Sequence, residues 1–180
     1  MSKNGLILLT PTSIAYTGTS ATISANGSVS FSACTVLSLN GVFSADYDNY
    51  MVVMRETATI AQVFQVRLRA SGTDASDSGH THQLILGSTT VSAQRDAGQT
   101  AFRISNTANV LRQGHILNFY GPHLAQPTAL RSVSVCAIDG AFIFDVAQTH
   151  SVSSSYDGFS LLPNAAGNIT GRVAVYGMRK

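Results

Sequence analysis

The chain has 180 residues, of which 44% are hydrophobic and only 11% are charged, and its formal net charge is +2. This length fits one domain that can bury a real core, and the hydrophobic content excludes a disordered chain. The small net charge, without a run of Lys or Arg, gives no electrostatic footprint for nucleic acid. Serine, threonine, asparagine, glutamine and glycine replace the missing charges, which fits a particle-bound or extracellular β protein.

The first 20 residues have no helical period, and Pro11 and Gly18 interrupt them. The apolar run from Gly5 to Leu9 is too short for the core of a signal peptide or for a membrane span. We therefore expect residues 1–20 to form an extended arm that reaches away from a domain of residues 21–180 and contacts a neighbour. The apolar residues that would make this contact are Leu6, Ile7, Leu8, Leu9 and Ile14.

The next segment, residues 22–31, places Asn26-Gly27 between two stretches of alternating residues. This pattern is a strong short-range signal for a β-hairpin. A further strand is predicted for residues 35–39, and it stops at a second Asn-Gly pair, Asn40-Gly41. The chain thus begins its folded part with short antiparallel strands.

The stretch Val42 to Glu56 is the one around which we expect the domain to be organised. Tyr47 and Tyr50 flank a turn rich in Asp and Asn, and the apolar run from Met51 to Met54 is too short for a good helix. The pattern predicts an aromatic-rimmed turn that leads into a buried strand. Nothing in it has the spacing of a catalytic base and nucleophile.

Residues 62–69 alternate cleanly, with Phe64, Val66 and Leu68 on one side. This pattern predicts a half-buried strand whose outer face carries Arg67 and Arg69, either solvated or at a subunit interface. Residues 70–81 have the composition of a loop. Further strands are predicted for residues 83–86, 101–104, 115–120, 130–138, 141–147, 159–162 and 172–176.

Turn residues separate nearly all of these short strands, and Asp139-Gly140 is typical of a second tight hairpin. The pattern predicts an all-β fold, an antiparallel β-sandwich of jelly-roll type in a single domain with an extended N-terminal arm. Cys34 and Cys136 lie in apolar segments and are interpreted as buried free thiols.

The most prominent group for chemistry is His80-Thr81-His82, which in an extended segment places both imidazoles on one side. His80 and His82 from three chains could meet a metal ion on a threefold axis, although an exposed or subunit-contacting loop explains them more simply. Asp74 and Asp77 lack the closing Glu of a calcium loop. No G-x-S-x-G elbow is present, so we predict neither enzymatic activity nor a cofactor.

Two blocks resemble small virion structural proteins of tailed bacteriophages, like those of phages of cyanobacteria. The first block is Phe43 to Tyr50, FSADYDNY, and the second is Tyr156 to Phe159 leading to residues 167–177, GNITGRVAVYG, with a central loop at Arg69 to Asp74. The resemblance implies a jelly-roll sandwich, commonly trimeric, on the virion. In place of the aromatic residues expected after the central loop, this chain has His80 and His82.

From this resemblance we expect a non-enzymatic virion protein, made in the host cytoplasm, that forms a homotrimer on the outer surface of the particle. Its partners would be the phage major capsid protein, as in a capsid decoration or cement protein, or tail and neck proteins. The alternative is a tail or neck fibre component that binds host surface polysaccharide through loop 70–82. A carbohydrate-binding lectin or enzyme would need clustered aromatic residues, and the chain contains no Trp.

Overall fold

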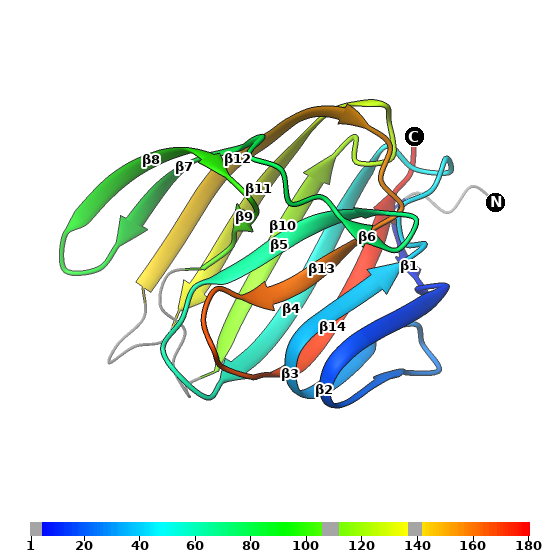
Figure 1. The fold of residues 1–180 in the computed structure, drawn as a ribbon, viewed down its shortest axis with the longest axis horizontal. Coiled ribbons are helices and arrows are strands. Elements are labelled where there is room, and N and C mark those ends of the chain that lie inside the picture. The colour runs from blue at the N-terminus through cyan, green and yellow to red at the C-terminus, as the bar shows by residue number, and fades with distance from the viewer. Residues whose placement is uncertain (1–4, 106–111, 137–141) are drawn as a thin grey trace.

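The computed structural model describes residues 5–105, 112–136 and 142–180, and within these ranges it contains strands and no helix. Accordingly, no helix in the described part of the chain could cross a membrane. The strands, drawn in Figure 1, are β1 (Leu6–Leu9), β2 (Ser13–Ile23), β3 (Val29–Asn40), β4 (Asn49–Ala58), β5 (Phe64–Ala70), β6 (Thr73–Asp74), β7 (His80–Gly87), β8 (Val91–Gln99), β9 (Phe102–Arg103), β10 (Gln113–Tyr120), β11 (Gln126–Cys136), β12 (Phe142–Ser154), β13 (Gly158–Pro163) and β14 (Ile169–Met178).

The strands form one antiparallel sheet that curls back on itself, so that the fold is an all-β sandwich. The large layer has the order β14-β4-β10-β11-β12-β7-β8, and the small layer has the order β6-β5-β13-β3. The first half of β3 pairs with β14 and its second half pairs with β13, so β3 passes from one layer to the other. Figure 1 shows the small layer in front of the large one.

The passage of β3 between the layers requires an irregularity, which lies at Ala33 and Cys34. Ala33 has a φ of 47°, and the pairing with β2 shifts register opposite it, at Gly18. A Cβ on Gly18 would lie 2.3 Å from the carbonyl oxygen of Ala33, and its φ of 148° also disfavours other residues. This bulge bends the strand and allows one sheet to supply both layers.

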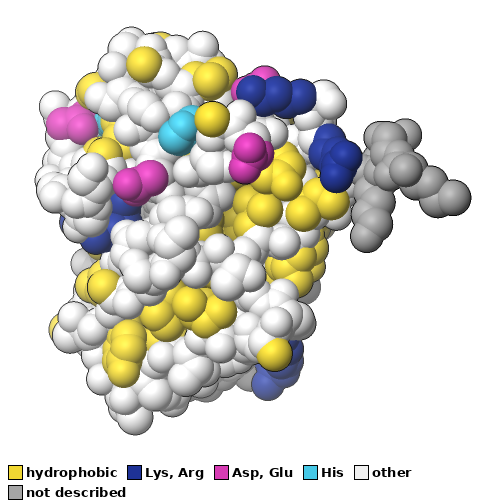
Figure 2. All heavy atoms as spheres, turned by 90° about the vertical axis from the view of Figure 1, so that its right-hand side faces the viewer, with side chains coloured by type: hydrophobic (Ala, Val, Ile, Leu, Met, Phe, Trp, Pro, Cys, Tyr) yellow, Lys and Arg dark blue, Asp and Glu magenta, His cyan; other side chains and the backbone are white. Residues whose placement is uncertain are grey.

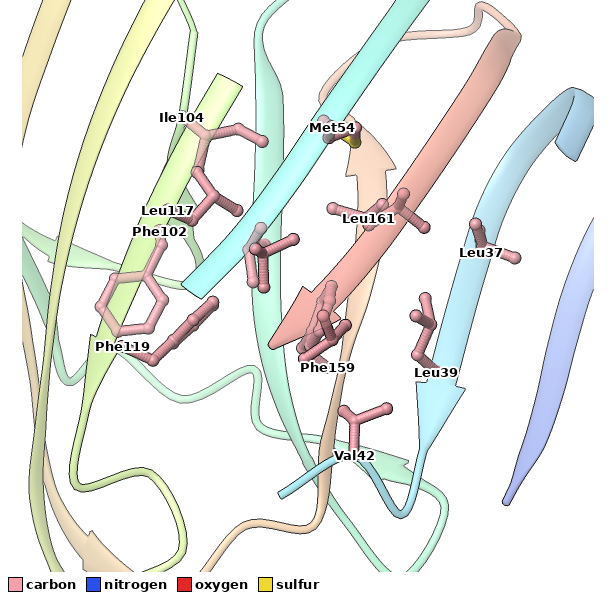
Figure 3. Close-up of a cluster of buried hydrophobic side chains, with 14 of the residues drawn as sticks. Leu37, Leu39, Val42, Met54, Phe102, Ile104, Leu117, Phe119, Phe159 and Leu161 are labelled. Atoms are coloured by element: carbon pink, nitrogen blue, oxygen red, sulfur yellow. The ribbon is translucent and has the colours of Figure 1, made fainter. Parts of the chain in front are cut away.

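The main core fills the space between the two layers, as Figure 3 shows for its central part. Phe43 is its centre, because its ring lies 4.7 Å from that of Tyr50, 5.3 Å from that of Phe119 and 5.8 Å from that of Phe159. The hydroxyl of Tyr50 donates to the carbonyl of Ser44 and accepts from its amide. The organising stretch is therefore confirmed as the place where a rimmed turn leads into a core strand.

The wing formed by β12, β7 and β8 extends beyond the small layer. Beneath it lies a second, smaller apolar cluster of Leu84, Cys136, Phe144 and Val146. Both cysteines are buried, as predicted, and no disulfide bond joins them. Phe102 and Ile104, on β9 and just after it, belong to the main core.

The N-terminal segment differs from the expected arm. β1 pairs with β14, and β2 pairs with β3 along ten residues of each strand. The boundary expected at residue 20 falls inside β2, so residues 6–23 belong to the sheet. Pro11 lies between β1 and β2, where it interrupts no ladder. Truncation through residue 18 would thus remove an edge strand and half of the next strand.

The first predicted hairpin is present, although its loop is longer than the two-residue turn that Asn26-Gly27 favours. Ile23 pairs with Val29, and the amide of Ser24 donates to the carbonyl of Ser28. The strand predicted for residues 35–39 is the second half of β3, which ends at Asn40 as expected. The second predicted hairpin, at residues 138–141, lies outside the described residues.

Candidate functional site

The outer face of the large layer, which points away from the core, carries an uncovered group of aliphatic side chains. Ile116 on β10 pairs with Val53 on β4 and with Val133 on β11, and Val135 pairs with Ile143 on β12. Cross-strand partners face the same side of a sheet. We call this group, together with Ile85 on β7, the apolar patch; its members are Val53, Ile85, Ile116, Val133, Val135 and Ile143, with exposures from 38% to 60%.

The apolar patch extends over five neighbouring strands, from β4 to β7. An ion pair lies next to the patch on the same face: the guanidinium of Arg131 donates to the carboxylate of Asp145 at 2.7 and 3.1 Å. An exposed apolar surface of this kind usually marks a contact site. By contrast, on the side of the molecule that holds both termini, apolar side chains fall into separate groups (Figure 2).

The margin of the apolar patch is basic. Arg55 on β4 pairs directly with Arg172 on β14, and both lie with Arg112 around a hollow of about 270 Å³. Arg172 donates to the hydroxyl of Ser28 at 2.9 Å, which holds its guanidinium in place. An apolar centre with a charged margin is the composition of many protein interfaces.

The residues predicted to form an N-terminal contact have other surroundings. Leu9 and Ile14 are partly buried and pack against the main core. Ile7 and Leu8 are half-buried in β1, and Leu6 alone of the five is exposed, at 46%. The apolar character of this segment therefore serves packing of the sheet edge, and the extended arm expected for it is replaced by paired strands.

The two arginines of β5 also differ from the expected basic outer face. The inward side of the strand is confirmed, because Phe64, Val66 and Leu68 are buried. However, Arg69 is only 8% exposed; it forms an ion pair with Asp74 and donates to Ser160 at 3.0 Å. Arg67 is half-buried, and its Nε donates to the carbonyl of Thr100. Both side chains are occupied within the chain, and Arg69 is excluded from a surface contact.

His80 and His82 face the same side of β7, as predicted, but that side is the interior. They are 1% and 4% exposed, which rules out the expected exposed loop and leaves neither ring at the surface for a shared threefold axis. Nε2 of His82 lies 2.9 Å from the carboxylate of Asp96 on β8. His80 and His82 thus share a face of the strand but contact different partners.

His80 belongs to a cluster that the sequence did not indicate, which we call the histidine cluster: Asp77, His80, His150 and Tyr156. Nε2 of His150 lies 3.0 Å from both carboxylate oxygens of Asp77, and its Nδ1 lies 3.1 Å from the hydroxyl of Tyr156. Because a carboxylate only accepts, Nε2 carries the proton and Nδ1 accepts from Tyr156. The ring of His80 stacks on that of His150 at 4.2 Å.

The charges of the histidine cluster are set by burial and by its hydrogen bonds. Burial, assisted by His150, lowers the pKa of His80 to about 4, so that this ring is neutral at neutral pH. Burial alone would raise the pKa of Asp77, but the hydrogen bonds from His150 and from the amide of Gly79 lower it, so Asp77 is ionised. Asp77 and His150 are 73 positions apart, and no sequence spacing links them.

A second polar chain crosses the inner face of β4, β10 and β11. Nε2 of His115 lies 3.0 Å from Oε1 of Glu56, and its Nδ1 lies 2.8 Å from Oγ of Ser134, which in turn donates to the carbonyl of Ile104. This order of carboxylate, imidazole and hydroxyl has the composition of a nucleophilic triad. Yet the side chains of Glu56 and His115 have no exposed surface, so the arrangement is closed to a substrate.

Comparison with known proteins gives no family. No family model matches the chain, and no curated protein matches it. Among solved structures, the chain is similar to domain 4 of AbnA, a GH43 extracellular arabinanase from Geobacillus stearothermophilus, in complex with arabinotriose. The alignment covers 97% of this chain and 82% of that one, with 12% identity and a TM-score of 0.36. A likeness at this level carries no conclusion about function.

Proposed function

We propose that this protein is a non-enzymatic structural component of a virion that assembles with copies of itself through the outer face of its large layer. The apolar patch is the observation that carries this proposal. Six aliphatic side chains on five adjacent strands remain uncovered in the single chain, and covering them releases hydrophobic free energy of about 25 cal/mol per Å² of apolar surface. The chain thus gains stability from a neighbour.

The resemblance to small virion proteins supplies the setting for this assembly. In that setting the chain is a capsid decoration or cement protein that forms a homotrimer on the outer shell. An interface that uses the patch of one copy and a different surface of the next is heterologous, and such an interface closes into a ring when the rotation fits. The basic margin of Arg55, Arg112 and Arg172 fixes orientation in such an interface, because charged groups contribute mainly to specificity.

The alternative of a polysaccharide-binding fibre tip has less support from the geometry. Loop 70–82 would be that tip, but Asp74 is paired with Arg69, and His80 and His82 are buried. Asp74 and both histidines are thus engaged within the chain and do not offer a free polar side chain to a sugar. The absence of enzymatic activity is likewise part of the proposal, and the sealed chain of Glu56, His115 and Ser134 supports it.

The oligomeric state tests the proposal. Light scattering at micromolar concentration is expected to give the mass of a trimer for the wild-type chain. Ile116→Lys places a charge in the centre of the patch and is expected to yield monomers, since Ile116 is 46% exposed and its loss leaves the core intact. Ile60→Lys is the matched control, because Ile60 is 42% exposed but lies in the loop after β4.

Two outcomes contradict the proposal: a wild-type chain that remains a monomer, or an Ile116→Lys chain that remains a trimer. Electron microscopy of phage particles that carry a label at the C-terminus separates the two locations on the virion. Label over the shell supports a decoration protein, whereas label at the tail or neck supports a fibre component.

A further inference from the structure

We propose that Asp77, His80 and His150 form a binding site for one first-row divalent ion, with Zn²⁺ as the representative ion, within a single chain. The three residues come from the loop before β7, the start of β7 and the middle of β12. One potential ligand atom from each lies within 4.8 Å of the other two. This site is distinct from the pairing of His80 with His82 that the sequence suggests, because His82 turns to Asp96.

The spacing of the three groups is close to that of a loaded site. Ligand atoms in a tetrahedral zinc site, each about 2.0–2.2 Å from the ion, lie about 3.4 Å from one another. The carboxylate of Asp77 and Nε2 of His150 are already 3.0 Å apart. The ligand atom of His80 lies within 4.8 Å of the other two, and its ring has to turn out of the stacking contact with His150 for its nitrogen to approach them at the spacing of a loaded site.

The donor set itself selects the class of ion. Two imidazoles and one carboxylate suit zinc and other first-row transition ions, whereas Ca²⁺ and Mg²⁺ take oxygen ligands almost alone. Nε2 of His80 is buried and has no hydrogen-bond partner in the part of the chain that the structure describes. This ring, which is 1% exposed, therefore does not use its full bonding capacity within the protein.

The surroundings fit a ligand role for His150. Its other nitrogen contacts the hydroxyl of Tyr156, and such a partner fixes the orientation of a metal-bound imidazole. When Nε2 binds an ion, its proton moves to Nδ1, which then donates to the same hydroxyl; a tyrosine hydroxyl can accept as well as donate. The side chain of Asp77 is 44% exposed, which gives the ion a path and leaves room for a water ligand.

Titration of the chelator-treated protein, without a histidine tag, tests this site. Calorimetry with Zn²⁺ is expected to show one ion per chain, and Co²⁺ is expected to give the intense visible absorption of a tetrahedral complex. Asp77→Asn and His150→Gln should each weaken binding at least about tenfold, since even the loss of an outer partner has effects of 10- to 100-fold. Zn²⁺ should raise the Tm of the wild-type chain and leave that of Asp77→Asn unchanged.

His82→Gln is the matched control, because His82 is also buried, lies on the same strand and contacts a carboxylate, yet stands outside the three-residue set. It should bind Zn²⁺ as the wild-type chain does. Absence of stoichiometric binding to the wild-type chain, or an equal loss in His82→Gln, overturns the proposal. Asp77→Asn changes a partly exposed loop residue and should fold, so the test stands even if His150→Gln does not fold.

Discussion

Val52→Asp is expected to prevent folding. Val52 lies on β4 with no exposed surface, inside the main core between the two layers. Its Cα partners on either side are Leu117 and Val175, both buried, so the structure offers an introduced carboxylate no hydrogen-bond donor from these side chains. Burial of an unpaired carboxylate has a free-energy cost of several kcal/mol, which is comparable with the whole stability of a domain, about 5–15 kcal/mol.

Val152→Asp is the control for this prediction. Val152 also lies on a strand, β12, but it is 37% exposed and stands outside the apolar patch. The same change there should lower the free energy of unfolding by about 1 kcal/mol or less, which is the range of strand propensities. Circular dichroism with urea titration measures both variants. A Val52→Asp chain with a wild-type unfolding curve would refute the placement of this strand in the core.

His115→Leu is expected to lower the free energy of unfolding by about 3–5 kcal/mol, the usual effect of removing one partner of a buried pair. The variant leaves the carboxyl group of Glu56 in the core without the imidazole that lies 3.0 Å away. Oε2 of Glu56 already has no hydrogen-bond partner among the described residues. In the variant, the carboxyl group of Glu56 therefore has no second hydrogen bond among the described residues to replace the lost one.

The double variant Glu56→Leu with His115→Leu separates loss of the pair from loss of packing. Replacement of a whole buried pair by apolar residues is often neutral or stabilising, so the double variant should be more stable than His115→Leu alone. Ser134 keeps its hydrogen bond to the carbonyl of Ile104 in both variants. Urea unfolding of the wild-type chain, Glu56→Leu, His115→Leu and the double variant gives the coupling energy between the two sites. A double variant less stable than both single variants would contradict a buried pair of this kind.

Local patterns in the sequence were sufficient for the organising stretch. Residues 42–56 contain both the turn residues and the apolar run, and the ring of Tyr50 closes onto Ser44 only six positions away. The alternation in β5 likewise placed Phe64, Val66 and Leu68 in the core. In these segments each side chain finds its surroundings through contacts that follow directly from strand periodicity, so the all-β class and much of the main core could be predicted.

Contacts between distant segments decided the state of the N-terminus and of β5. Residues 6–9 look like an exposed apolar arm until β14, some 170 positions later, supplies the strand that they extend. Arg69 reads as an outward residue, yet Ser160, 91 positions later, encloses it together with the nearby Asp74. A chain edge or a charged side chain remains uncovered in sequence reasoning because the covering residues lie far away along the chain.

Alternation along the strands shows that each has two faces, but only the packing of the folded chain selects the face that is buried. In the large layer the usual sorting is partly reversed: His80, His115 and His150 point inward, while Ile116 and Ile143 point to the outside. Strand alternation has a period of two, so it shows which residues share a face. Where both faces contain polar and apolar residues, it does not show which face is buried. The inner face is the buried one because the segment that contains β9 lies against it. Asp77 and Glu56 form hydrogen bonds there that compensate the burial of His150 and His115. Burial of the face that carries the histidines forms the histidine cluster and leaves the apolar patch exposed on the opposite face.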